Sequence, residues 1–154
     1  MTTCDARTMC DAGATKQDRW ISLIAVAAVV GILVSIFSVF AHYGVVSSEV
    51  CSINDTFDCD TVNKSAYSEL FGIPVALLGV LTYIVFFLGV MAYDRNHSQK
   101  LLQALMTLGG AGLIFSLYLT SIEAFVLYTW CILCLASQAA ILAIVIGLWR
   151  LQKL

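Results

Sequence analysis

The chain has 154 residues, of which 60% are hydrophobic and 12% charged, and its net charge at pH 7 is −2. Because soluble domains carry about 25% charged residues, this composition excludes an ordinary soluble domain and predicts a small polytopic membrane protein. A single proline favours helices throughout, and a slightly acidic chain without a basic patch excludes nucleic acid as an expected partner.

Residues 1–19 form a polar segment that we expect to be a disordered tail. A signal peptide is not expected, because the apolar run that follows is too long and no small-residue cleavage site closes it. Cys4 and Cys10 lie in this segment. They are either a redox pair or incidental thiols, and the flexible setting favours incidental thiols.

Residues 20–41 are the first predicted membrane span, because they contain no charged residue and are long enough to cross a hydrocarbon core of about 30 Å. The second predicted span covers residues 73–93, with Pro74 in the first helical turn, where proline is tolerated. A short charged turn follows at residues 94–100.

Residues 101–149 contain one charged residue, Glu123, and are too many for one span, so they predict two. We expect the chain to reverse at residues 126–130, where Tyr128 and Trp130 suit an interfacial aromatic belt. The fold class is therefore an all-α, four-helix transmembrane bundle over residues 20–150, followed by a short tail at residues 151–154. A stripe of small residues at four-residue spacing, Gly112, Ser116 and Thr120, predicts a helix-packing seam.

Residues 42–72 are the longest polar loop and contain Cys51 and Cys59. Within residues 60–71, three apolar side chains recur at four-residue spacing: Val62, Ala66 and Leu70. This pattern predicts a short amphipathic helix at the membrane surface.

The Lys and Arg residues predict the orientation of the bundle. With four spans, Lys64 falls on one side and seven other cations fall on the opposite side: Arg7, Lys16, Arg19, Arg95, Lys100, Arg150 and Lys153. The positive-inside rule then places both termini in the cytoplasm. The loop of residues 42–72 and the reversal before the fourth span would both face the oxidising compartment outside.

Cys131 and Cys134 form a C-x-x-C pair at the start of the last apolar run. A helix that begins here places the two side chains on one face, within reach of each other. The partial positive charge at the helix N-terminus favours the thiolate, the form that attacks disulfides. The alternative is a pair of small apolar core residues, since free cysteine packs as a small hydrophobe.

Four cysteines on one side of the membrane allow three interpretations: a redox relay, a pair of structural disulfides on a non-enzymatic scaffold, or a four-cysteine metal site. A zinc site is disfavoured because Cys51 and Cys59 are too widely spaced for the usual structural ligand pairs. A C-x-x-C disulfide closes a very small loop and adds little stability, which favours an exchangeable bond. The relay is our preferred interpretation.

The order and spacing of these residues resemble the bacterial members of the vitamin K epoxide reductase family. The similarity rests on Cys51-x7-Cys59, on Val62, Ser65 and the Phe-Gly-Ile-Pro run at 71–74, and on the late Cys131-x-x-Cys134. It implies a quinone pocket inside the bundle, with ubiquinone or menaquinone as cofactor, in a bacterial inner membrane. It further implies that Cys134 reacts with the quinone, that Cys131 pairs with Cys134 and exchanges with Cys59, and that Cys51 receives electrons from a thioredoxin-like partner. Electrons would run from protein thiols to quinone and support disulfide bond formation, whereas epoxide reduction is the animal specialisation.

Three residues are cofactor-binding candidates: Ser65, Ser68 and Gln138. Gln138 stands where animal members have a tyrosine, one helical turn from Cys134, and either donates a hydrogen bond to a quinone or makes an interhelical contact. Ser68 stands where animal members have an asparagine. Many bacterial members carry a fused thioredoxin-like domain, which this sequence does not include, so the expected partner is a separate protein.

Glu123 is the remaining unusual residue, since a carboxylate inside a membrane is costly and often functional. A proton-handling role is one interpretation. The other is that Glu123, near the outer end of the third span, simply reaches water.

Overall fold

The computed structural model describes residues 6–45, 69–70, 72–128 and 130–154. These ranges include four helices long and apolar enough to cross a membrane, over Lys16–His42, Val75–Asn96, Gln99–Leu127 and Ile132–Gln152. The four predicted spans are thereby confirmed, with ends that shift by only a few residues. The second and third membrane helices continue into the predicted turn at residues 94–100, since one ends at Asn96 and the next begins at Gln99.

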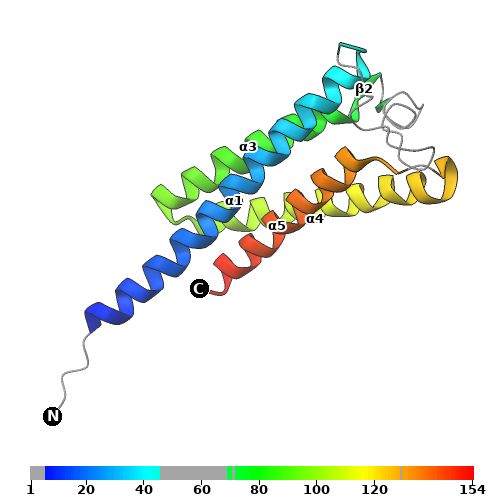
Figure 1. Ribbon diagram of the computed structural model, residues 1–154. Coiled ribbons are helices and arrows are strands. Elements are labelled where there is room, and N and C mark those ends of the chain that lie inside the picture. The colour runs from blue at the N-terminus through cyan, green and yellow to red at the C-terminus, as the bar shows by residue number, and fades with distance from the viewer. Residues whose placement is uncertain (1–5, 46–68, 71, 129) are drawn as a thin grey trace.

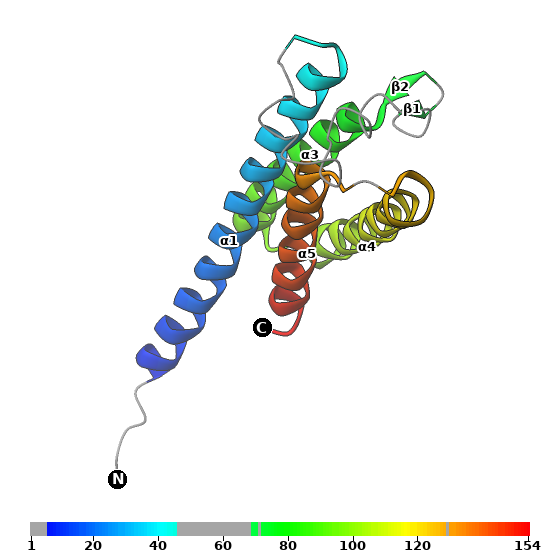
Figure 2. The same cartoon turned by 45° about the vertical axis from the view of Figure 1, so that its right-hand side comes forward.

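In chain order the elements are α1 (Ala6–His42), the strands β1 (Glu69–Leu70) and β2 (Ile73–Pro74), α3 (Val75–Asn96), α4 (Gln99–Ile122), a π-helical turn η3 (Glu123–Leu127) and α5 (Ile132–Gln152). Figure 1 shows α1 and α3 lying side by side, with α5 against α1 and α4 on the other side of α5. In Figures 1 and 2, α3 and α4 meet at their shared turn and then diverge.

The first helix is longer than the predicted span, because α1 already begins at Ala6. Residues 6–18, which we expected to belong to a disordered tail, continue the helix. Once an apolar span has nucleated a helix, each further residue adds one backbone hydrogen bond, so a polar extension is inexpensive.

The segment before α3 is a two-stranded antiparallel hairpin in which Glu69 pairs with Pro74 and Leu70 with Ile73. Gly72 has a φ of 79° and reverses the chain, while Pro74 restricts the residue before it to extended conformations. Most of the surface helix predicted for residues 60–71 lies outside the described residues, but Glu69 and Leu70 at its end form a strand instead. Pro74 consequently precedes the first turn of α3 as its N-cap.

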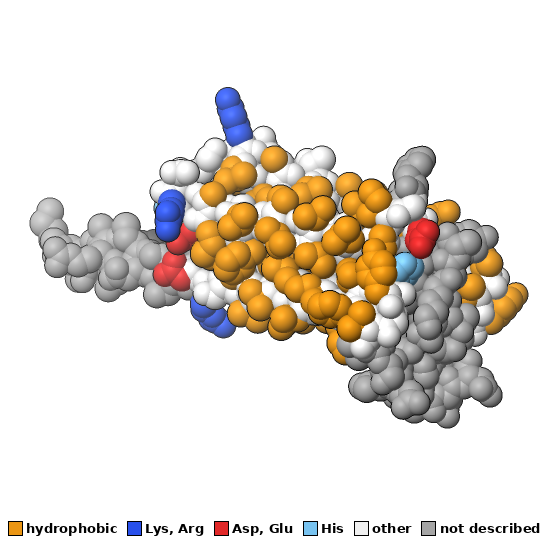
Figure 3. Space-filling view, turned by 90° about the horizontal axis from the view of Figure 1, so that it is seen from above, with side chains coloured by type: hydrophobic (Ala, Val, Ile, Leu, Met, Phe, Trp, Pro, Cys, Tyr) orange, Lys and Arg blue, Asp and Glu red, His pale blue; other side chains and the backbone are white. Residues whose placement is uncertain are grey.

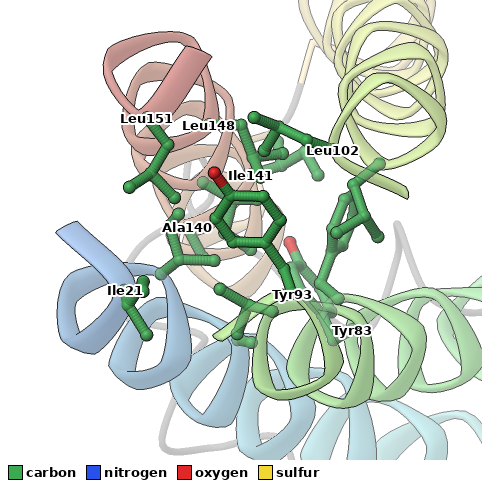
Figure 4. Close-up of a cluster of buried hydrophobic side chains, with 14 residues drawn as sticks. Ile21, Tyr83, Tyr93, Leu102, Ala140, Ile141, Leu148 and Leu151 are labelled. Atoms are coloured by element: carbon green, nitrogen blue, oxygen red, sulfur yellow. The ribbon is translucent and has the colours of Figure 1, made fainter. Parts of the chain in front are cut away.

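One half of the bundle is a close-packed core, shown in Figure 4. The side chains that are almost fully buried there come from all four helices and include Ile24, Phe86, Leu102, Ile144 and Leu148. Glycine permits close approach of the helices: a Cβ atom at Gly147 of α5 would lie 2.6 Å from Ile24 Cγ1 of α1. Van der Waals contact of this kind, rather than water exclusion, drives helices together in lipid.

The same half of the bundle contains the start of α1, the α3–α4 turn and the end of α5. Gln17 Nε2 lies 3.2 Å from His97 Nδ1 in the turn, and the Arg150 guanidinium lies 5.9 Å from the centre of the Trp20 ring. Figure 3 shows Lys and Arg side chains toward this end and a broad band of hydrophobic side chains beside them. We call this half of the bundle, with its close-packed core, the packed end.

Candidate redox site

The opposite half of the bundle, which we call the cavity end, encloses a cavity of about 190 Å³ between α1, α3, α4 and α5. Most of its wall is apolar, with side chains such as Val34, Leu78, Phe115 and Ile141. The polar side chains in the wall belong to Ser35, Ser38, His42, Thr82, Tyr83, Ser116, Thr120, Glu123, Cys134 and Ser137. An apolar cavity with a few polar groups is the usual form of a small-molecule site.

Cys134 lies in the wall of this cavity, and Cys131 lies immediately behind it. Cys131 is the N-cap of α5, and its sulfur accepts a hydrogen bond from the Cys134 backbone N–H at 3.3 Å. The Cys131 side chain is 0% exposed and packs against Phe37 and Leu133, whereas Cys134 is half-buried. The predicted dithiol at a helix N-terminus is therefore present, with Cys134 on the cavity side.

Glu123 completes the group around the two cysteines. Its carboxylate Oε2 accepts a hydrogen bond from the Cys131 backbone N–H at 3.2 Å, and its side chain is close enough to the Cys134 side chain for the two to interact electrostatically. Glu123 lines the cavity but is only 2% exposed. The interpretation in which Glu123 reaches water is wrong, because the π-helical turn that begins at this residue directs the carboxyl group toward the start of α5.

A second polar contact crosses the cavity end from α3 to α5. The Tyr83 hydroxyl donates to the Ser137 backbone carbonyl at 2.6 Å and lies 2.8 Å from Ser137 Oγ. Since the phenol has one hydrogen, the Ser137 hydroxyl is left to donate back to Tyr83. This pair ties α5, one turn beyond Cys134, to α3.

Ser35 and Ser38 of α1 are buried serines of the cavity wall, with exposures of 5% and 7%. Within the described part of the chain, neither hydroxyl has a hydrogen-bond partner. The close approach of α3 at Gly79, where a Cβ atom would lie 2.9 Å from Ser35 Oγ, holds Ser35 in the interface. A buried polar group without a partner is costly, so these two serines are suited to a ligand.

Gln138 makes the interhelical contact that was one of its two predicted roles. Its Oε1 accepts a hydrogen bond from Thr120 Oγ1 at 2.9 Å, and Gln138 is not part of the cavity wall. The residues of the predicted small-residue seam have two roles. Gly112 packs near Ile141, as expected for helix packing, while Ser116 and Thr120 place polar atoms in the cavity wall.

At the rim of the cavity, His42 at the end of α1 pairs with Glu69 of β1, with 3.3 Å between Nε2 and Oε1. The side chain of His42 is largely buried and that of Glu69 is half-exposed. The pair fastens the hairpin that leads into α3 to the end of the first span.

Several predicted site residues lie outside the described residues: Cys51, Cys59, Ser65 and Ser68, together with Val62 and Cys4. The structure therefore brings together Cys131 and Cys134 and leaves their exchange with the loop cysteines a prediction. Among the residues it describes, no three His, Cys, Asp or Glu side chains are grouped to hold a metal ion.

The sequence interpretation missed four polar residues of the cavity end: Ser35, Ser38, Tyr83 and Ser137. Ser35 and Ser38 are three residues apart in an otherwise apolar span, and Ser137 follows Cys134 by the same interval. This spacing places each pair on one helix face, which was a usable signal.

Comparison with known proteins gives one family. The sequence model of the vitamin K epoxide reductase family matches residues 22–149, which is nearly the whole chain. No curated protein matches the chain.

Proposed function

This chain belongs to the vitamin K epoxide reductase family and is a membrane thiol–disulfide oxidoreductase. From this premise we propose that it passes electrons from protein thiols to a membrane quinone. The observation that supports this most directly is the position of Cys134. A cysteine at a helix N-terminus, with a second cysteine behind it, forms part of the wall of an apolar cavity inside the bundle.

The cavity suits the ring of a quinone. Its volume of about 190 Å³ is below the roughly 300–1,000 Å³ of pockets that enclose whole drug-sized ligands, so it would take a ring and leave an isoprenoid chain in the lipid. Ser35 and Ser38 would hold the ring, because their buried hydroxyls are able to donate to carbonyl oxygens. When bound, the quinone supplies a two-electron, two-proton acceptor.

We assign the electron path to four cysteines. Cys51 receives electrons from a separate thioredoxin-like partner, and the Cys51/Cys59 pair passes them to Cys131/Cys134 by thiol–disulfide exchange. Attack of Cys59 on the Cys131 sulfur forms a Cys59–Cys131 bond, breaks the Cys131–Cys134 bond and leaves Cys134 as the thiolate beside the cavity. Attack of Cys51 on the Cys59 sulfur then forms the Cys51–Cys59 bond and releases Cys131, so that the inner pair is fully reduced. Return of the inner pair to the disulfide then releases two electrons and two protons, which reduce one quinone to a quinol.

The membrane orientation belongs to the same proposal. The packed end contains Arg95, Lys100, Arg150 and Lys153, which the positive-inside rule places in the cytoplasm, in a bacterial inner membrane. The cavity end would then face the oxidising outer compartment, where electrons flow from newly exported protein thiols toward ubiquinone or menaquinone and support disulfide bond formation.

The test is thiol oxidation by purified protein in lipid nanodiscs, with and without a short-chain ubiquinone or menaquinone. We expect a small dithiol to be oxidised only when quinone is present, with one quinol formed for each disulfide. Quinone-independent or absent oxidation would instead support the disulfide-stapled scaffold.

The two-stage path has its own test. Cys51→Ser should abolish turnover with a thioredoxin-like donor but retain activity with a small dithiol, which is able to attack the inner disulfide directly. Cys4→Ser is the matched control and should behave as the unmodified protein with both donors. In Cys134→Ser protein, mass spectrometry after proteolysis should find a Cys59–Cys131 linked peptide, and a dominant Cys51–Cys131 peptide would reverse the two loop roles.

A further inference from the structure

Glu123 is a buried titratable group that the electron path leaves without a role. It lies at the cavity wall with 2% exposure, bonded to the Cys131 backbone N–H and lining the same cavity as Cys134. Resting on the proposed function, we propose that Glu123 is the proton acceptor for Cys134: its carboxylate takes the thiol proton when the inner pair is oxidised and returns it to the acceptor in the cavity.

The backbone at Glu123 is what places the carboxyl group there. The π-helical turn Glu123–Leu127 ends at Tyr128, whose φ of 51° is left-handed, and the chain then enters α5 through Cys131. π-Helical turns are rare and often mark functional sites. The fold thus keeps an unusual backbone that brings an acidic side chain of the third span to the first turn of the fourth.

The surroundings of the carboxylate suit a group that gains and loses a proton. The Cys131 N–H, aligned with the N-terminal end of α5, donates to Oε2 at 3.2 Å and stabilises the charged form. The carboxyl group also lines the same cavity as the Cys134 side chain and interacts with it electrostatically. Under the proposal, one proton passes between these two neighbouring side chains, which exist either as thiol and carboxylate or as thiolate and carboxylic acid.

The proton balance of the reaction requires such a group. Formation of the Cys131–Cys134 bond breaks two S–H bonds, and two electrons leave for the quinone together with two protons. Inside an apolar cavity no bulk water collects these protons. A carboxylate that lines the same cavity as Cys134 takes one of them without a charged group moving through the membrane interior.

Two other titratable side chains face the same cavity, and both are engaged elsewhere. His42 of α1 pairs with Glu69 at 3.3 Å, and the Tyr83 hydroxyl of α3 donates to the Ser137 carbonyl at 2.6 Å. Glu123, by contrast, accepts a hydrogen bond from the Cys131 backbone N–H and interacts with the Cys134 side chain. Glu123 is accordingly the group best placed to exchange a proton with Cys134.

A purely structural role is the alternative, in which Glu123 only anchors the start of α5. Glu123→Gln separates the two roles, because the amide oxygen still accepts from the Cys131 N–H while the side chain no longer takes a proton. Asp94→Asn makes the same chemical change at an exposed residue of the packed end and is the matched control. Glu123→Asp keeps the carboxyl group and tests for rescue.

The main experiment measures the rate of Cys134 alkylation by iodoacetamide against pH in reduced protein without quinone or partner, followed on the Cys134 peptide by mass spectrometry. Two interacting groups titrate in two macroscopic steps, so we expect a two-step profile in the unmodified, Asp94→Asn and Glu123→Asp proteins. Glu123→Gln should give one step, and its quinone-dependent kcat should fall about 100-fold at unchanged KM, the lower range for loss of a general acid–base group.

A single-step profile in the unmodified protein overturns the proposal even if Glu123→Gln does not fold. So does a two-step profile that survives in folded Glu123→Gln. Because alkylation needs no quinone, the expected profiles combined with an absence of quinone-dependent oxidation would count against the proposed function and not against proton sharing by Glu123 and Cys134.

Discussion

The two ends of this bundle are built from the same four helices, yet one is close-packed and the other encloses a cavity. At the packed end, side chains such as Phe86 and Ile144 are 0% exposed and helices approach over glycine. At the cavity end, α4 diverges from α3 (Figures 1 and 2), and the space of about 190 Å³ is bordered by hydroxyl, thiol and carboxyl groups.

The difference suggests that one end of the bundle provides stability and the other provides the chemistry. In lipid, helix association depends on close packing, so one half of the bundle must be well packed for the whole to stay assembled. The other half is then free to hold polar groups that leave space between helices. Stability and chemistry should consequently respond to substitutions at opposite ends.

The largest expected effect separates chemistry from stability. Cys134→Ser should abolish quinone reduction with every thiol donor, because an alcohol does not form the disulfide, while the free energy of unfolding stays the same within about 0.5 kcal/mol. Quinol absorbance measures the activity, and denaturant unfolding in detergent measures the free energy of unfolding. Residual quinone reduction at the level of the unmodified protein would remove Cys134 from the reaction.

The next effect is on stability alone. Gly147→Ala places a Cβ atom 2.6 Å from Ile24 Cγ1, and we expect the unfolding free energy to drop by about 1–3 kcal/mol, as for other overpacked cores. Gly110→Ala is the matched control, since a Cβ atom there meets nothing within 4 Å. Equal stability of the two variants would mean that the packed end tolerates insertion and that the contrast between the ends is overstated.

A third, smaller effect should weaken quinone binding without weakening the fold. Replacing both Ser35 and Ser38 by Ala should raise the KM for quinone about tenfold, equivalent to about 1.4 kcal/mol, because the ring loses its donors. The same change removes two unpartnered buried hydroxyls and should leave the unfolding free energy equal or higher. A loss of stability together with an unchanged KM would show that the serines serve the helix interface.

The smallest effect concerns Gln138. Removal of its contact with Thr120 in Gln138→Leu should lower the unfolding free energy by about 0.6 kcal/mol, the average for interhelical hydrogen bonds in membranes, and should leave the KM for quinone unchanged. An increase in KM comparable with that of the serine variant would instead support the predicted quinone contact of Gln138.

The sequence was sufficient for the spans and for the dithiol because both depend on local rules. About 20 apolar residues must cross as a helix, since backbone groups in lipid have to be satisfied within the segment. The reversal before Cys131 was likewise predicted within residues 126–130, where the structure has the left-handed residue Tyr128. The hairpin at Glu69–Pro74 was missed because the four-residue spacing of apolar side chains indicated a helix, although Gly72 and Pro74 favour a turn.

The polar wall of the cavity was not predictable in the same way. Thr107 and Ser121 donate to the carbonyl four residues back in their own helices, at 3.0 Å and 2.9 Å, which is the ordinary behaviour of such residues in membrane helices. Ser35 has the same local sequence environment but faces a neighbouring helix. Only the crossing of α1 and α3 distinguishes these cases, and periodicity within one helix does not contain that information.

The size of the cavity has a consequence for selectivity under the proposed function. A site that encloses a ring but not a chain discriminates among quinones by ring substituents and is indifferent to the number of isoprene units. The rest of each substrate molecule partitions into the bilayer, so the relevant concentration is a mole fraction in lipid, which greatly exceeds any aqueous concentration of so insoluble a compound. A weak, shallow contact with the ring then suffices for saturation, and the product leaves by lateral diffusion as easily as the substrate arrives.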